Sequence, residues 1–145
     1  MRNEVKRKMS EEYDYYVRIV IDGMDVNSVK TILNAFDFFI ENYHMTIGVD
    51  FLNKTLQLFD PHQNKEIKIK ASLLVLGKEE RFSSLMQMYY HGALVVFFIK
   101  ENNVRTPEIV YRNTIAPVIK ILDTPKEFTY ELFESIMKEL VESFE

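Results

Sequence analysis

Residues Ala93 to Ile99 are apolar without interruption, seven in a row with the sequence ALVVFFI. A strand with one face in solvent alternates apolar and polar residues, whereas a strand covered on both faces is apolar throughout. Doubly covered strands belong to parallel sheets that have helices on either side. This run therefore predicts a central strand in a layered α/β domain, and the rest of the chain has to supply further strands and the covering helices.

Strand and helix patterns alternate along the remaining chain. Strands are predicted by β-branched or alternating apolar residues at Tyr15 to Ile21, Val49 to Phe59, Ile67 to Leu76 and Val118 to Leu122. Helices are predicted by apolar residues at helical spacing at Ser28 to Ile40, Ser83 to His91 and, most clearly, Phe128 to Phe144. The turn-forming segment Asp60 to Glu66 (DPHQNKE) joins two strands into a hairpin. This order predicts a mostly parallel central sheet with one antiparallel hairpin strand and helices on both faces.

The segment from Glu101 to Ala116 breaks this alternation. It is weakly patterned, contains Pro107 and is followed by Pro117. It is too short for a complete passage of helix, strand and helix. We therefore expect a sheet that is shortened after its fourth strand.

Length and composition exclude several classes of function. With 145 residues we expect a flexible leader over residues 1–13 and one domain over residues 14–145. The net charge of −4 gives no reason to expect nucleic acid as a partner. The absence of Cys excludes disulfides, thiolate metal sites and a lipid anchor on cysteine of this chain. No apolar run approaches the roughly 18 residues of a membrane span, so we expect a cytoplasmic protein that reaches membranes only through a partner.

Two stretches resemble the Rab proteins of the Ras superfamily of small GTPases. In Glu41 to Leu58, Tyr43 is followed by the block Thr46-Ile47-Gly48-Val49-Asp50-Phe51, which is similar to switch I and the next strand of Rab proteins. In Glu79 to Ile99, Glu80-Arg81-Phe82 and Tyr89-Tyr90-His91-Gly92-Ala93 are similar to the switch II helix and the strand after it. Both blocks occur in the family's order and spacing. The resemblance implies a Ras-like P-loop fold.

The phosphate-binding loop of this family departs from its pattern here. The family has Gly-x-x-x-x-Gly-Lys-Ser/Thr, where the glycines let the backbone wrap phosphates. In this chain Lys30 and Thr31 are present, but Gly23 lies seven residues before the lysine instead of six, and Val29 replaces the second glycine. The segment is either a rearranged loop that touches phosphate through Lys30 or a plain helix start capped by Asn27 or Ser28, and we favour the second.

The other nucleotide-handling motifs are also altered. The resemblance assigns the switch I threonine, which closes over Mg²⁺, to Thr46, and that residue is retained. The switch II motif Asp-x-x-Gly-Gln is replaced, because its Asp, Gly and Gln positions hold Val75, Lys78 and Glu79, although Gly77 could supply the glycine if the loop is shifted by one residue. No Asn-Lys-x-Asp motif for base recognition follows the fifth strand. The Ser-Ala-Lys loop before the last helix is replaced by LDTPKE, in which Asp123-Thr124 is predicted to be a turn and helix cap.

These changes predict a pseudo-GTPase without catalytic residues or a bound cofactor, which acts as a protein-interaction or scaffold module in trafficking or signalling. The alternative is a divergent GTP-binding protein with slow or no hydrolysis, in which Lys30, Thr31 and Thr46 contact the nucleotide and Thr31 and Thr46 hold Mg²⁺. The histidines are too scattered for a metal site.

The partner-binding surface is predicted from the switch-like blocks, because Met and aromatic side chains adapt well to protein interfaces. Packing of the methionine and tyrosine side chains against the domain's own sheet is the competing possibility. The resemblance assigns to this surface Tyr43, Ile47, Val49, Phe51, Arg81, Phe82, Met86, Tyr89 and Tyr90.

Overall fold

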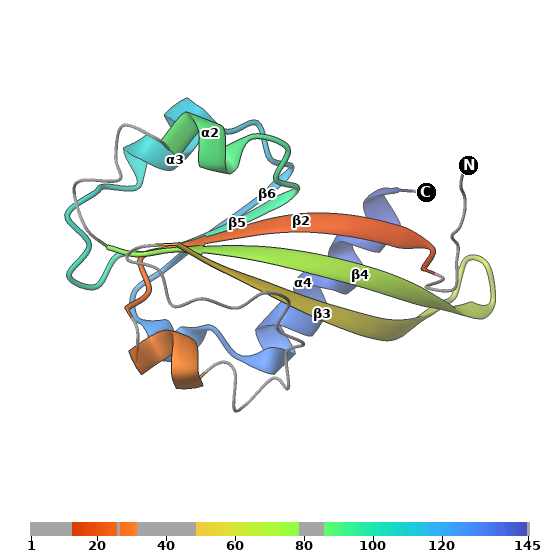
Figure 1. The fold of residues 1–145 in the computed structure, drawn as a ribbon. Coiled ribbons are helices and arrows are strands. Elements are labelled where there is room, and N and C mark those ends of the chain that lie inside the picture. Colours follow the sequence, from red (N-terminus) through yellow and green to blue (C-terminus); the bar gives the residue numbers. More distant parts are fainter. Residues whose placement is uncertain (1–12, 26, 32–48, 79–85, 145) are drawn as a thin grey trace, which may run out of the picture.

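A computed structural model of the chain describes residues 13–25, 27–31, 49–78 and 86–144 (Figure 1). Five strands form one sheet in the spatial order β3-β4-β2-β5-β6. Neighbouring strands are parallel except for the antiparallel pair β3–β4. The strands are β2 (Tyr15–Asp22), β3 (Val49–Asp60), β4 (Lys65–Leu76), β5 (Val95–Ile99) and β6 (Val118–Leu122).

The central strand β5 has the property that its sequence predicts. All five of its residues are buried, because helices cover both faces of the sheet at this point. On one side β5 pairs with β2 and on the other with β6, and both pairings are parallel. The mostly parallel sheet with a single antiparallel strand confirms the predicted fold class, a shortened Ras-like fold.

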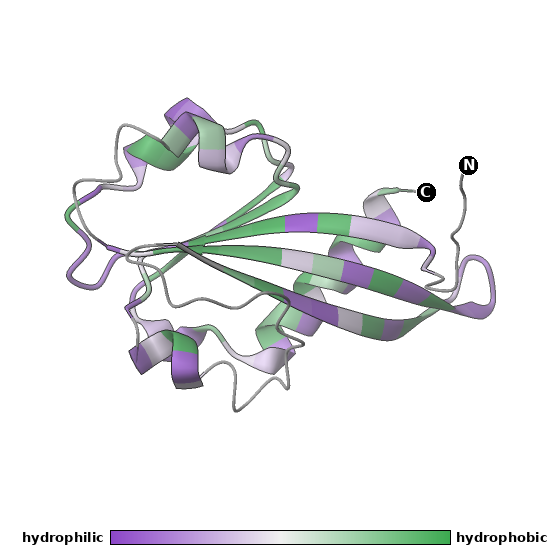
Figure 2. Cartoon of the chain, viewed as in Figure 1, coloured by the Kyte–Doolittle hydropathy of each residue, from purple (hydrophilic) through white to green (hydrophobic). Residues whose placement is uncertain are grey.

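The antiparallel hairpin β3–β4 also lies where the sequence predicts it. Its register runs from Val49 opposite Leu76 to Asp60 opposite Lys65. At the turn the Asp60 carboxylate accepts a hydrogen bond from the His62 amide at 2.9 Å. Figure 2 shows β4 apolar near the centre of the sheet and alternating between apolar and polar residues toward the hairpin tip.

Helix α4 (Tyr130–Ser143) covers one face of the sheet. It buries Phe133, Ile136 and Leu140 in the larger of two apolar clusters. The Thr129 hydroxyl caps this helix by accepting a hydrogen bond from the Leu132 amide at 3.1 Å. The prediction of a cap at Asp123-Thr124 was wrong, because Thr124 precedes the 3₁₀ turn η2 (Pro125–Glu127) and its side chain makes no capping bond.

Two short helices, α2 (Met86–Tyr90) and α3 (Glu108–Asn113), cover the opposite face near the ends of the central strands (Figure 1). They close a second apolar cluster, which includes Val20, Val96 and Phe98 of the sheet. The weakly patterned segment after β5 contains only α3 before the chain enters β6. This agrees with the predicted shortening of the sheet after its fourth strand.

Several predictions fall partly on residues that lie outside the described ranges. The predicted helix Ser28 to Ile40 is described at residues 27–31, which are helical, and the predicted helix Ser83 to His91 at Met86–Tyr90. The predicted leader lies outside the described residues up to residue 12. Among the helices that the structure describes, none combines the length and apolar character that crossing a bilayer requires.

Candidate functional site

The candidate site lies at the carboxyl ends of the parallel strands, which is where open α/β sheets bind their ligands. Four parallel strands end here, β2 at Asp22, β4 at Leu76, β5 at Ile99 and β6 at Leu122, and each continues into a loop. Gly23 follows β2 with a φ of +107°, which favours glycine. A Cβ atom at this position would lie 2.5 Å from the Ile99 carbonyl oxygen, so the loop after β2 and the end of β5 are in close contact.

The helical turn 27–31 is capped by Asp25. Its Oδ1 accepts a hydrogen bond from the Ser28 amide at 2.8 Å, and its backbone carbonyl accepts one from the Val29 amide at 3.0 Å. The Ser28 amide bond is the main cause that lowers the pKa of the Asp25 carboxyl, and the charge of Lys78 contributes. The prediction of a cap at Asn27 or Ser28 was therefore wrong by two or three residues, because the helix begins earlier than its apolar stripe suggests.

Asp25 also joins two loops that the family resemblance assigns to nucleotide binding. Its Oδ2 lies 3.6 Å from Nζ of Lys78, the residue that replaces the switch II glycine. The pair is partly exposed, since the two side chains are 19% and 49% accessible for Lys78 and Asp25, respectively. Partly exposed ion pairs contribute little to stability. This pair nevertheless connects the loop after β2 with the loop after β4 through the charged side chains of Asp25 and Lys78.

Of the predicted nucleotide-binding residues, the structure describes Lys30 and Thr31. Lys30 and Thr31 are both exposed. The Thr31 hydroxyl donates a hydrogen bond to the Asn27 carbonyl at 3.1 Å, within its own helical turn. Val29, which replaces the second glycine of the loop, is buried in the main core. Thr46 lies outside the described residues.

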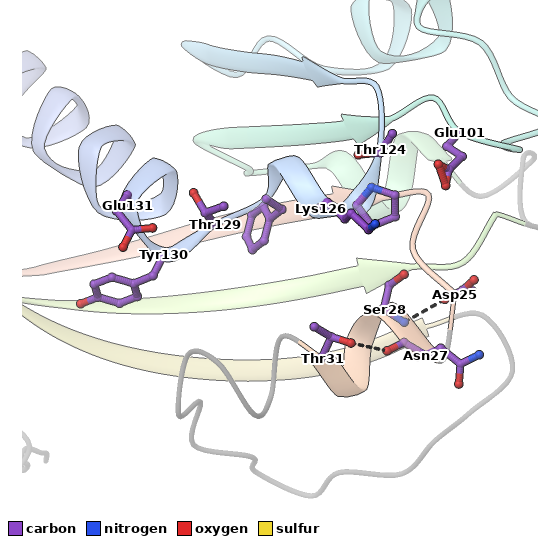
Figure 3. A pocket seen from close by; sticks show the side chains of 12 residues that line it. Asp25, Asn27, Ser28, Thr31, Glu101, Thr124, Lys126, Thr129, Tyr130 and Glu131 are labelled. Atoms are coloured by element: carbon purple, nitrogen blue, oxygen red, sulfur yellow. Dashed lines mark hydrogen bonds between the residues drawn. The ribbon is translucent and has the colours of Figure 1, made fainter.

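A pocket of about 830 Å³ lies between the helical turn 27–31 and the segment that leads into α4 (Figure 3). Its charged side chains are three carboxylates, Asp25, Glu101 and Glu131, and one cation, Lys126. The segment 123–129 follows the fifth described strand and directly precedes the last helix. One loop thus stands where the resemblance would place both the base-recognition motif and the Ser-Ala-Lys loop.

A buried polar network was missed by the sequence analysis. Asp22, at the end of β2, is fully buried, and the Arg105 side chain is 2% exposed. The two form an ion pair, in which Arg105 Nε donates to Asp22 Oδ2 at 3.3 Å and Nη2 donates to Oδ1. Arg105 Nη2 also donates to the Gly77 carbonyl, and the Tyr90 hydroxyl donates to Asp22 Oδ2 at 2.6 Å.

The network perturbs the Tyr90 phenol. Its pKa is raised far above the usual 10, first by burial and then by the negative charge of Asp22. The only sequence signal for this network is an aspartate directly after a buried apolar strand. Arg105 lies in the weakly patterned segment, and nothing in the sequence pairs the two residues.

The predicted partner-binding residues have mixed environments. Phe51 is 57% exposed on β3, and Tyr89 is partly buried with its carbonyl accepting from Arg18 Nη2 at 3.2 Å. Met86 and Tyr90 are each 1% exposed. They pack in the second apolar cluster, so their assignment to the surface was wrong.

The remaining predicted partner-binding residues are incompletely described or not described. For Val49 the structure describes the strand but not the side chain. Outside the described residues lie Tyr43, Ile47, Arg81 and Phe82. Within the described ranges, no three His, Asp or Glu side chains form a group that could hold a metal ion.

Comparison with known proteins agrees with the fold. Over 106 residues the chain is 32% identical to the Ras-related protein RABD1 of Arabidopsis thaliana, and this match covers 67% of this chain and 49% of RABD1. Over 91 residues it is 32% identical to the Ras-related protein RABA2a of the same plant, covering 61% and 39%, respectively. The chain therefore spans about half or less of the length of these relatives. No family model matches the chain.

The sheet topology and this similarity together define the class. The chain has a shortened Ras-like fold. Its sequence similarity supports a relationship to the Ras/Rab-like small GTPases.

Proposed function

We propose that this chain is a Rab/Ras-like pseudo-GTPase that acts as a protein-interaction or scaffold module in trafficking or signalling. One observation carries the proposal. The N-terminus of the helical turn 27–31, where the resemblance places the phosphates, holds the carboxylate of Asp25 instead. Helix N-termini bind anions through free backbone amides and the helix dipole, and here an anion of the chain itself is bound to the Ser28 amide.

A nucleotide phosphate would have to displace this carboxylate or lie beside it. Displacement costs the cap, about 1 kcal/mol. Coexistence brings like charges together, and Glu101 and Glu131 add to the negative charge along the same pocket. Lys30 is exposed and can still approach a phosphate. Met24 and Val29, however, pack in the core, and neither position has the glycine that lets a backbone wrap around a phosphate.

The proposed interaction surface includes apolar side chains that the described structure leaves exposed on both switch-like segments. Phe51 on β3 is 57% exposed, and Met88 on α2 is 60% exposed. Contiguous exposed apolar patches mark binding surfaces, and we infer that Phe51 and Met88 belong to one such patch. Because β3 is a strand of the sheet and α2 packs on the sheet through Met86 and Tyr90, this surface can be presented without a bound nucleotide.

The first experiment tests nucleotide binding. The chain is unfolded in denaturant, freed of small molecules, refolded, and titrated with GTP–Mg²⁺ and GDP–Mg²⁺ in a calorimeter. We expect no heat of binding at nucleotide concentrations up to the order of 1 mM, equivalent to an affinity weaker than about −4 kcal/mol. Submicromolar binding of either nucleotide would overturn the pseudo-GTPase proposal.

The second experiment tests the surface. A photo-crosslinking amino acid is introduced in place of Phe51 or Met88, and in a matched control in place of the exposed Lys138 on α4. We expect the same protein partner to be crosslinked from positions 51 and 88 and not from position 138. Equal crosslinking from all three positions, or none from 51 and 88, would contradict a partner surface at the switch-like segments.

The alternative function is a divergent GTP-binding protein with slow or no hydrolysis, using Lys30, Thr31 and Thr46 with Mg²⁺. The observation that favours it is the pocket of about 830 Å³ beside Thr31, which is large enough for a nucleotide. If it is correct, GTP–Mg²⁺ but not ATP–Mg²⁺ raises the melting temperature by a few degrees, and Lys30→Ala removes this shift. Lys126, on the opposite wall of the pocket, provides the control. If Lys30 contacts a phosphate, Lys126→Ala should keep the shift in melting temperature, whereas a general effect of positive charge would be lost in both variants.

A further inference from the structure

The buried ion pair of Asp22 and Arg105 lies at a junction of four chain segments. Asp22 ends β2, Gly77 follows β4, Tyr90 ends α2, and Arg105 comes from the loop between β5 and α3. Arg105 bonds directly to the first two and reaches the third through the shared carboxylate of Asp22. Removing the guanidinium would therefore uncouple elements that are far apart in the sequence.

The loop that carries Arg105 is itself held in place. Asn103 Nδ2 donates to the Ile99 carbonyl at 3.2 Å, and its Oδ1 accepts from the Arg105 amide at 3.0 Å. Gly23 packs closely against Ile99 and the Asn103 side chain. These contacts fix the backbone of Arg105 relative to β5, so the guanidinium enters the junction from a rigid base.

The chemistry of the junction requires an arginine. The guanidinium has a planar fork that can serve both carboxylate oxygens and a separate carbonyl at once, whereas a lysine ammonium acts as a point charge. A carboxylate as deeply buried as Asp22 is tolerated only when it is paired and hydrogen-bonded. Here its partners are Arg105 and Tyr90, and Tyr90 belongs to the helix that carries Met88.

We propose that Arg105 is a positioning residue that fixes α2 against the ends of β2 and β4 through contacts within the chain. The guanidinium supplies the positive charge that holds these loops in one arrangement. This inference goes beyond the proposed function and does not depend on it, because it concerns the free chain. Arg18, which donates to the Tyr89 carbonyl at 3.2 Å, is a second and independent anchor of α2.

Amide hydrogen exchange on the full chain tests this proposal. The reporters are the hydrogen-bonded amides of His91 and Ala93, which donate to the carbonyls of Met88 at 3.3 Å and Tyr90 at 3.1 Å. In Arg105→Met we expect these amides to exchange at least roughly tenfold faster, while amides in the middle of α4 change much less. Arg105→Lys should fall between wild type and Arg105→Met, since it keeps the charge but loses the fork. Arg112→Met, at an exposed position of α3, is the matched control and should leave exchange unchanged.

Two results would overturn the proposal. The first is faster exchange by the same factor in α2 and α4, which indicates only a global loss of stability. The second is unchanged exchange at His91 and Ala93 in Arg105→Met. If Arg105→Met does not fold, Tyr90→Phe replaces it, because that variant retains the Asp22–Arg105 pair and removes only the link to α2. Faster exchange confined to α2 in Tyr90→Phe supports the proposal, and wild-type exchange refutes it.

Discussion

Replacement of Arg105 by Met should be among the most destabilising single changes in the described part of the chain. It leaves the fully buried Asp22 carboxylate with the Tyr90 hydroxyl but without its counter-charge. Removing one partner of a buried ion pair typically costs about 3–5 kcal/mol. A domain of this kind has a free energy of unfolding of only about 5–15 kcal/mol. With a shift of roughly 2–4 °C per kcal/mol for slightly larger domains, the melting temperature should fall by about 10 °C.

The cost should depend on Asp22. If Asp22 is replaced by Asn in the same chain, no unpaired charge remains at the junction, and the side-chain oxygen can still accept from Tyr90. The double variant Asp22→Asn/Arg105→Met should therefore lose less than the sum of the two single variants, by about 1–3 kcal/mol. Urea unfolding followed by far-UV circular dichroism measures all four proteins, since the chain has no Trp to report by fluorescence.

A second ion pair supplies the control. Lys100 Nζ lies 2.9 Å from Asp123 Oδ1, but the two side chains are 50% and 70% exposed. Lys100→Met should cost at most about 0.5–1 kcal/mol because solvent screens this pair. The reasoning about the junction fails if the stability losses of Asp22→Asn and Arg105→Met sum to the loss of the double variant within about 0.5 kcal/mol. It also fails if Arg105→Met loses no more stability than Lys100→Met.

Three further predictions concern single positions. Gly23→Ala should destabilise by at least about 2 kcal/mol in urea unfolding, since its φ is +107° and the new methyl group would lie 2.5 Å from the Ile99 carbonyl oxygen. Gly92→Ala, at φ +79°, should cost less, because the new methyl group would meet Arg18 Cδ at an ordinary contact distance of 3.9 Å. Phe133→Ala should lose about 3–5 kcal/mol, because this ring is fully buried in the main core. The pKa of Tyr90 is raised in the folded chain, so the protonated phenol contributes its full stability below about pH 10, the pKa of an unfolded tyrosine. Above that pH the free energy of unfolding should decrease by up to about 1.4 kcal/mol per pH unit. Between about pH 9 and 11, the free energy of unfolding of Tyr90→Phe should therefore decrease less steeply than that of the wild type.

Secondary structure was largely predictable because burial on this sheet leaves a periodic trace in the sequence. The uninterrupted apolar run Ala93 to Ile99 marks β5, and Val118 to Leu122 coincides with β6. The hairpin follows from alternating residues on both sides of a turn-forming segment. The stripe of α4 was recognisable for the same reason, although its start required knowing that Thr129 caps the helix.

The candidate site was less predictable, because its contacts join residues far apart in the sequence. Asp22 and Arg105 are separated by 83 positions, and Asp22 and Tyr90 by 68. Periodicity carries no information on such pairs. Met86 and Tyr90 were assigned to the surface from the family resemblance, yet a spacing of four residues places both on one face of α2, and that face packs on the sheet.

The cap at Asp25 and the ion pair at Arg105 bear on the same question of what could bias this domain between two states. A ligand shifts an equilibrium only as far as its affinities for the two states differ. A phosphate would bind at the N-terminus of the helical turn 27–31, but the Ser28 amide there is already bonded to Asp25. Displacing the Asp25 cap weakens phosphate binding by about 1 kcal/mol. If the carboxylate stays nearby, charge repulsion weakens it further. For α2, Arg105 supplies a positive charge from within the chain, which holds the helix through Asp22 and Tyr90. If phosphate and Asp25 compete for the Ser28 amide, Asp25→Asn should be the variant in which any residual nucleotide affinity increases, because it keeps a capping oxygen but removes the charge. If Arg105 holds α2 independently of Asp25, the same variant should leave amide exchange at His91 and Ala93 unchanged.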